Sequence, residues 1–194
     1  MAHINSLGVG LFTDLSIAIG TSIVPATYDD TGFKALFATI DTGTLTDAAI
    51  AGGFYRILDV REFPAMGTPA NIVKVPVFGV KQSQQIQGQA DAPTMEITLN
   101  YIPANWDPVT GLSKFVGDNI TRAFRFALLN QDSTGITAAT KYASLALGLG
   151  TVQNSVYYWT GRMEALLVKP SLTDATTATL TLSMQSDFYG AYTY

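Results

Sequence analysis

Few side chains in this sequence have the chemistry of a catalytic or metal-binding site. His3 is the only histidine among 194 residues, and cysteine is absent. A Ser-His-Asp triad or a histidine-containing metal site would therefore need His3, which belongs to a stretch that we expect to form an N-terminal arm. The absence of cysteine excludes disulfide and thiolate chemistry. We therefore expect no nucleophile–base pair, no metal and no cofactor.

Carboxylates are the remaining candidates for chemistry. Asp29 and Asp30 are adjacent, but their surroundings lack the D-x-D-x-D-G spacing of a calcium loop, so a helix cap or a turn is the better interpretation. A glycoside hydrolase would need two carboxylates facing each other across a cleft. No feature of the sequence favours Glu96, Glu164 or Asp174 for that role. An acid-pair hydrolase is therefore the least favoured hypothesis, and we expect a protein that is not an enzyme.

Composition narrows the classes of partner. Only 13% of the residues are charged, about half the share of an ordinary soluble domain, which suits permanent contact with other protein. The net charge is −4 and there is no basic patch, so nucleic-acid binding is not expected. No apolar run is long enough to span a bilayer, and we expect no membrane association. Trp106 and Trp159 are interpreted as core or interface anchors, with carbohydrate stacking as the alternative.

The elements that position these residues are mostly strands. Apolar and polar residues alternate from Thr94 to Tyr101, and this period of two predicts an antiparallel strand with one buried face. Shorter alternations predict strands over 54–60, 123–128, 157–168 and 176–184. Asp107 and Pro108 have the residue types of a helix N-cap and first turn. They predict a helix over 107–120 with an apolar stripe at Leu112, Phe115, Val116 and Ile120.

These elements predict one domain over residues 1–194. Its parts are an N-terminal arm or first strand within 1–20, a Pro/Gly-rich hairpin or loop over 61–80 and the helix over 107–120. A short helical turn near residues 29–37 is also expected, capped by Asp29, Asp30 or Thr31. The predicted fold class is mostly β, an antiparallel β-sandwich or barrel with one flanking α-helix and long loops.

One segment resembles a known family. Residues 25–36 are Pro-Ala-Thr-Tyr-Asp-Asp-Thr-Gly-Phe-Lys-Ala-Leu. They resemble the P-A-T-Y-D-x-x-G-F/Y-x-A-L stretch of the tail tube, or major tail, proteins of long-tailed bacteriophages. Residues 157–163, Tyr-Tyr-Trp-Thr-Gly-Arg-Met, are similar to a later strand of that family. The resemblance covers most of residues 23–187, although 134–150 is longer than the family would lead us to expect.

The resemblance implies a structural virion protein. Members of the family form hexameric rings that stack into a hollow tail tube, and the same core resembles the Hcp tube of type VI secretion. It implies partners that are further copies of the chain and other tail proteins: the tape measure, the terminator, and the baseplate or tip. DNA would pass through without specific binding, which suits an acidic chain. The expected location is the virion tail, with assembly in the host cytoplasm.

Two sets of residues follow from this interpretation. We expect the subunit interface to include Phe63, Pro64, Val75, Val77, Phe78, Leu11 and Phe12. We expect the acids that line the lumen to come from Asp59, Glu62, Asp91 and Glu96. The alternative functions are an Hcp-like secretion tube subunit or another virion component, such as a tail terminator or a head decoration protein.

Overall fold

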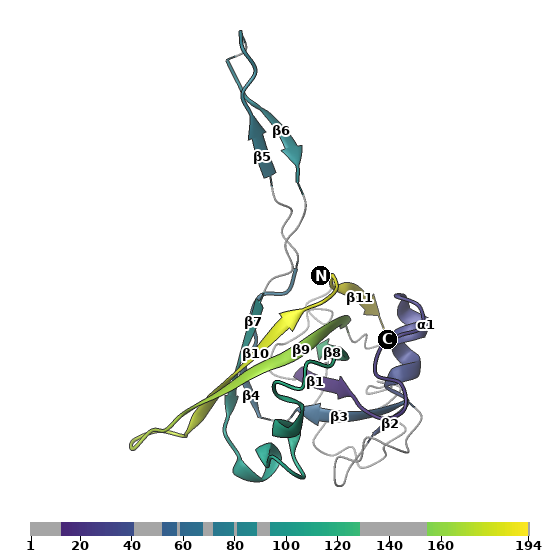
Figure 1. The fold of residues 1–194 in the computed structure, drawn as a ribbon, viewed down its shortest axis with the longest axis vertical. Helices are drawn as coiled ribbons and strands as arrows, with labels where there is room; N and C mark the ends of the chain where they lie inside the picture. Colours follow the sequence, from purple (N-terminus) through teal and green to yellow (C-terminus); the bar gives the residue numbers. More distant parts are fainter. Residues whose placement is uncertain are drawn as a thin grey trace, which may run out of the picture.

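The computed structural model describes residues 13–40, 52–57, 59–67, 72–79, 81–88, 94–128 and 155–193. These residues form a mostly β, largely antiparallel fold with a single α-helix in the described part, as the sequence predicts (Figure 1). The strands are β1 (Thr13–Ala18), β2 (Thr39–Ile40), β3 (Gly53–Ile57), β4 (Val60–Glu62), β5 (Ile72–Val75), β6 (Gln84–Gln87), β7 (Thr94–Asn100), β8 (Arg122–Leu128), β9 (Ser155–Lys169), β10 (Thr177–Met184) and β11 (Tyr189–Thr193).

The main sheet has nine strands, and β9 connects its two halves. The strand order is β2-β3-β1-β8-β9-β10-β7-β4, and β11 also pairs with β9. The first half of the 15-residue β9 pairs with β8, and its second half pairs with β10. Gly161 lies in both registers, opposite Arg122 and opposite Met184. One long strand therefore carries the chain from one half of the sheet to the other.

The two halves of the sheet pack on a common core. Strand β10 buries every second residue, and β7 does the same with Met95, Ile97 and Leu99, as its alternation predicts. These side chains join the inward residues of β1 and β8 and the fully buried Trp159 in one hydrophobic cluster. Because strands from both halves contribute to it, the sheet curves around this core.

The helix α1 (Asp30–Leu36) packs on the half of the sheet that contains β3, β1 and β8. It covers the face of these strands that points away from the common core. Asp29 is its N-cap, and its carboxylate accepts a hydrogen bond from the backbone N–H of Gly32 at 2.7 Å. Phe33 and Leu36 point into a second cluster with small residues of β1 and β8. The Phe33 ring stacks on Tyr158 of β9 at a centroid distance of 4.9 Å. The helical turn predicted near residues 29–37 is therefore confirmed.

The helix predicted over 107–120 is wrong. Two short 3-10 turns stand in its place, η2 (Pro103–Trp106) and η3 (Leu112–Phe115). One oxygen of the Asp107 carboxylate accepts hydrogen bonds from the N–H groups of Val109 and Thr110, both at 2.8 Å, which closes a local turn instead of a helix. Gly117 has φ +74°, a conformation that ends helical geometry. Leu112 and Phe115 are nevertheless buried, as the apolar stripe predicts.

The structure describes part of the predicted arm or first strand (1–20) and part of the predicted hairpin or loop (61–80). The part of the 1–20 arm that the structure describes contains β1, which pairs with β3 and β8 inside the sheet. Strands β5 and β6 form a separate two-stranded hairpin over 72–87, so the predicted boundary at residue 80 covers only its first half. This β5–β6 hairpin stands away from the body of the molecule (Figure 1).

A buried charge cluster joins β1, β3 and β8. The Asp14 carboxylate accepts hydrogen bonds from Arg56 Nε at 2.9 Å and from the Ser16 hydroxyl at 2.7 Å. The buried Arg125 guanidinium lies 4.0 Å from the same carboxylate. It also lies over the rings of Phe37 and Phe54, at 4.8 and 4.6 Å from their centroids. The Asp14 carboxylate and the two aromatic rings offset the free-energy cost of burying the Arg125 guanidinium.

We predict that Asp14→Asn lowers the free energy of unfolding by about 3 kcal/mol, because it leaves a buried guanidinium without its counter-charge. Urea denaturation of the two proteins measures this difference. Asp174→Asn is the matched control, since Asp174 is exposed and lies 3.9 Å from Arg61. That variant should change stability by less than about 0.5 kcal/mol. Equal effects of the two substitutions would contradict the role of the buried cluster.

Candidate assembly surfaces

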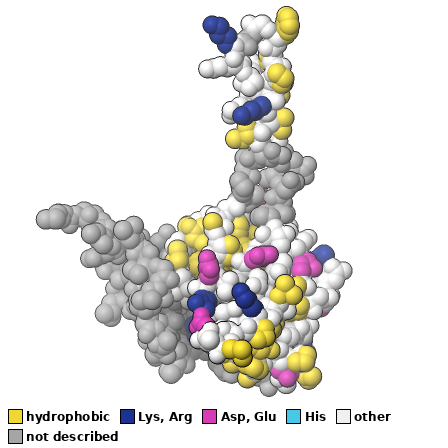
Figure 2. All heavy atoms as spheres, turned by 90° about the vertical axis from the view of Figure 1, so that its left-hand side faces the viewer, with side chains coloured by type: hydrophobic (Ala, Val, Ile, Leu, Met, Phe, Trp, Pro, Cys, Tyr) yellow, Lys and Arg dark blue, Asp and Glu magenta, His cyan; other side chains and the backbone are white. Residues whose placement is uncertain are grey.

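The two faces of the β5–β6 hairpin differ in their share of apolar side chains. Val73 is opposite Ile86, and Lys74 is opposite Gln85. Because side chains alternate across a strand, one face carries Val73, Val75 and Ile86 with Gln84, and the other carries Lys74, Gln85 and Gln87 with the exposed Ile72. Val73 and Ile86 are exposed to solvent. The space-filling view shows hydrophobic side chains along the hairpin (Figure 2).

The tip of the hairpin exposes further apolar groups. Val77 is exposed, and Phe78 is fully exposed beside Gly79, whose φ of +82° turns the chain back. A two-stranded hairpin is marginally stable in water unless something packs on it. A contiguous apolar surface on such a hairpin is typical of a contact with another protein.

The residues predicted for the interface fall into three groups. Phe63 packs in the protein's own core, with its ring stacked on Phe126 at a centroid distance of 4.1 Å, and Pro64 beside it is half-buried. Val75, Val77 and Phe78 belong to the hairpin and its tip. The remaining two, Leu11 and Phe12, lie outside the described residues. The structure therefore brings only the hairpin members of this set together.

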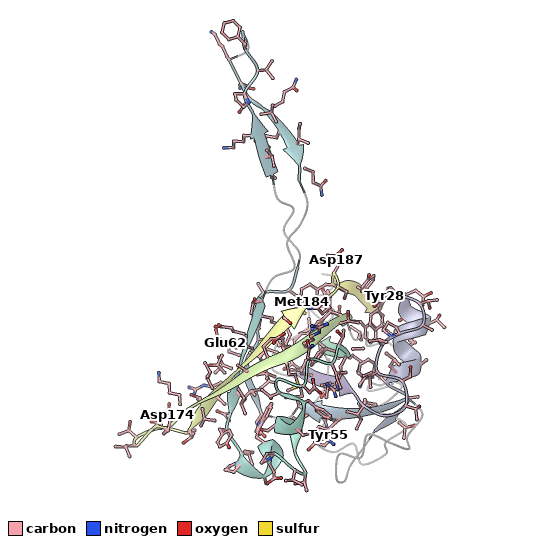
Figure 3. The ribbon with its side chains drawn as sticks, viewed as in Figure 1. Tyr28, Tyr55, Glu62, Asp174, Met184 and Asp187 are labelled. Atoms are coloured by element: carbon pink, nitrogen blue, oxygen red, sulfur yellow. The ribbon has the colours of Figure 1, made fainter. Side chains whose placement is uncertain are left out.

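Two of the predicted lumen acids share one open face of the sheet. Glu62 of β4 is opposite Thr98 of β7, and Glu96 lies two residues from Thr98 on the same strand. The side chains of Glu62 and Glu96 therefore project from the same outward face of the sheet, among the hydroxyl side chains of β7 and β10. Asp59 is exposed at the turn before β4, and Asp91 lies outside the described residues. Figure 3 labels Glu62 on this part of the body.

The carboxylates considered for catalysis do not meet in a cleft. Ser183 donates a hydrogen bond to Glu164 on the outer face of the sheet. A hollow of about 220 Å³ between β4 and the β9–β10 turn holds Asp174 as its single carboxylate. Its other lining residues are Arg61, Lys169, Ser171, Ala175 and Thr177. Glycoside hydrolysis needs two facing carboxylates, and this hollow supplies one.

Two exposed apolar patches were not predicted from the sequence. Leu167, Val168 and the fully exposed Leu172 lie at the β9–β10 turn. Ile102 precedes η2 and Val109 follows it, and both are exposed. The exposed fraction of Val109 is 78%. The second patch lies at the end of the body opposite the β5–β6 hairpin (Figure 1). Exposed apolar residues in turns carry no periodic signal, so only the structure identifies them.

The described residues were compared with two patterns, a cluster of metal-ligating side chains and a membrane-spanning helix. No group of three or more potential metal-ligating His, Cys, Asp or Glu side chains occurs in the part of the chain that the structure describes. Within the same part, no helix has the length and apolar character needed to cross a membrane.

The carboxylate of Asp107 organises the apolar patch at η2. Hydrogen bonds from the backbone of Thr110 and Val109, and from the Thr110 hydroxyl, hold the pKa of Asp107 below its ordinary value. The neighbouring Asp59 accepts a hydrogen bond from the Asn105 amide at 3.4 Å. This end of the body therefore places the exposed Val109 beside the carboxylates of Asp107 and Asp59.

Comparison with known proteins identifies a shared fold. The fold matches the sheath/tube terminator of an extracellular contractile injection system, PVC, solved by cryo-electron microscopy in the extended state. The TM-score is 0.50 and the sequence identity 10%, and the match covers 92% of this chain and 91% of that one. No protein-family model matches the sequence. No curated protein matches it either.

We predict that truncating Phe63 lowers stability far more than truncating Phe78 does. Phe63→Ala should lower the free energy of unfolding by about 3 kcal/mol, because it removes an aromatic ring from the core contact with Phe126. Phe78→Ala is the matched control and should change it by less than about 0.5 kcal/mol, because the ring is fully exposed. Chemical denaturation measures both. A large loss for Phe78→Ala would show that the hairpin tip packs on its own body.

A second prediction concerns pH. Because the folded pKa of Asp107 is depressed, its contribution to stability is present above the unfolded pKa of about 3.9 and is lost as the pH falls through the folded pKa. Asp107→Asn removes the charge. Its stability deficit relative to the wild type should therefore be largest near neutral pH and shrink in acid. Denaturation curves at several pH values test this, and a deficit independent of pH would contradict it.

Proposed function

We propose that this chain is a structural, non-enzymatic subunit of a tail-like particle, assembling as stacked hexameric rings into a hollow tube. The observation that carries the proposal is the exposed apolar β5–β6 hairpin, joined to a body that is otherwise well packed. A core of this kind folds without help, whereas the hairpin needs a partner to cover it. The tail-tube resemblance of residues 25–36 supplies the kind of assembly.

The solved neighbour supports a tail-associated role and favours a second candidate. That neighbour is a sheath/tube terminator of an extracellular contractile injection system. A terminator is therefore the alternative to a tube subunit in this proposal. An Hcp-like secretion tube and a head decoration protein are further alternatives, with no observation in this structure that favours them.

The channel of such a tube would be lined by the open face of β7 and β10. In this arrangement Glu62 and Glu96 face the lumen, among threonine and serine side chains. Asp59 and Asp91 remain candidates for the same role. Carboxylates repel the phosphate backbone, and neutral hydroxyl groups offer no net charge, so DNA would pass without specific binding. Other partners would be the tape measure and the baseplate or tip, and the location would be the virion tail.

We predict that purified wild-type protein forms rings and tubes in negative-stain electron microscopy as its concentration rises. The double variant Val77→Asp/Phe78→Asp should remain as small particles, because a charged tip cannot be buried in a neighbouring subunit. Its far-ultraviolet circular dichroism and melting temperature should equal those of the wild type. Phe78→Tyr, which keeps an aromatic ring, is the matched control and should still assemble.

The form of the assembly separates the two candidates. A tube subunit gives long hollow tubes, whereas a terminator gives isolated rings that add only to the ends of tubes made by another protein. Wild-type protein that stays monomeric at every concentration, and after long incubation with a tail extract that nucleates assembly, would contradict both.

A further inference from the structure

The β5–β6 hairpin differs in charge from the body that carries it. Residues 63–90 contain two lysines, Lys74 and Lys81, and no acid. The whole chain has a net charge of −4, so the remainder of the chain carries −6. The hairpin is therefore a basic and apolar projection on an acidic body. Opposite charge of this kind steers one copy toward another and selects where the hairpin docks.

Three exposed apolar patches on the body are candidates to receive the hairpin. The first is Leu167, Val168 and Leu172 at the β9–β10 turn. Its charged neighbours in the adjoining hollow are Arg61, Lys169 and Asp174, which leaves an excess of positive charge. This excess repels the two lysines of the hairpin, so the β9–β10 turn is a poor receptor.

The second patch surrounds Tyr28, whose exposed fraction is 50%. The Tyr189 ring lies 5.5 Å from the Tyr28 ring, the buried Phe33 ring lies 6.0 Å from it, and the acids of this patch include Asp29 and Asp187. The charge is suitable, but Figure 3 places Tyr28 and Asp187 at the end of the body from which the hairpin leaves. A hairpin docked there would join two copies head to head, and a two-fold contact of this type closes as a dimer.

The third patch lies at the opposite end, around η2. Val109 and Ile102 are exposed there, and Asp59 and Asp107 lie beside them. Of the bases in and beside this segment, Arg122 pairs with Asp118 at 2.6 Å, Arg162 donates to Asn119 at 2.6 Å, and Lys114 lies over the Phe115 ring. The carboxylates of Asp59 and Asp107 are the charged groups that hydrogen-bond η2 and the turn that carries Val109. A hairpin that leaves one end of the body and binds the other end of the next copy makes a head-to-tail contact. Such a contact can be repeated along an axis.

We infer that the β5–β6 hairpin of one copy binds the η2 surface of a second copy, with Phe78 and the hairpin valines against Ile102 and Val109. The two hairpin lysines then lie near Asp59 and Asp107. This inference rests on the proposed function, because it specifies which surfaces join consecutive rings. It makes the two ends of the subunit unlike and complementary.

The absence of cysteine in the chain allows a direct test by disulfide cross-linking. Phe78→Cys is prepared with a large affinity tag, and Val109→Cys is prepared without one. The two are mixed under conditions in which the wild type assembles, and then oxidised. Because both side chains are exposed, each variant should fold like the wild type. We expect a mixed disulfide dimer on a non-reducing gel, identified by its mass.

Two control mixtures decide between the receptors. Phe78→Cys is paired with Tyr28→Cys for the head-to-head contact and with Leu172→Cys for the β9–β10 turn; both positions are exposed. A mixed dimer with either control position that exceeds the Val109 dimer would overturn the inference. Assembly without any Val109 dimer would also overturn it while leaving the proposed function intact. Wild-type protein that never assembles would instead count against the proposed function itself, and the inference would fail with it.

Charge variants provide an independent readout in the same assay. Lys74→Glu/Lys81→Glu should cause loss of the mixed Val109 dimer, because like charges then meet at the η2 surface. Lys74→Arg/Lys81→Arg keeps the positive charge and should still form the mixed Val109 dimer. An undiminished dimer from the glutamate variant would overturn the charge argument that selects this surface.

Discussion

The architecture depends on the pairing of one strand, β9, with strands from both halves of the sheet. The register passes from β8 to β10 at Gly161, where a Cβ atom would lie 2.9 Å from the carbonyl oxygen of Ser183. Glycine is therefore required at the point where the strands approach most closely. Trp159, two residues earlier, is fully buried and stacks on Phe124 at a centroid distance of 5.6 Å. The common core exists because this strand holds both halves on either side of it.

The body buries its apolar side chains against other parts of the chain, whereas the β5–β6 hairpin leaves many of its apolar side chains exposed to solvent. In the body, apolar side chains from different elements pack on one another in two clusters, with Phe63 against Phe126 and Phe33 against Tyr158. The hairpin leaves its apolar face and Phe78 in water. Burying a Phe side chain is worth about 1.5–3 kcal/mol, and this gain is available to the hairpin only in contact with another molecule. The division between a self-sufficient body and an uncovered projection is what connects this fold to assembly.

Sequence patterns predicted the parts of the fold that depend on local periodicity. The alternation in β7 and β10 gave the correct buried faces, and Asp29 was among the caps proposed for α1. The same patterns failed where side chains compete with the backbone: Asp107 satisfies two N–H groups in a turn, so the expected helix does not form. Phe63 illustrates a different limit, because an aromatic residue in a Pro-rich stretch has the same local pattern in a core as in an interface. Only its tertiary contact with Phe126 distinguishes the two.

A shared fold at 10% identity does not choose between a tube subunit and a terminator, whereas the chemistry of the two ends of the molecule bears on that choice. Each ring inside a tube must bind one ring on either side, so its subunits need complementary surfaces at both ends. A terminator, which caps the tube, needs a ring-binding surface at only one end. In this chain Val77 and Phe78 are exposed at one end, and Ile102 and Val109 are exposed at the other. Under the proposed function, two unlike binding ends would produce a contact that repeats until something else stops it, which is the arrangement of a tube subunit and not of a cap.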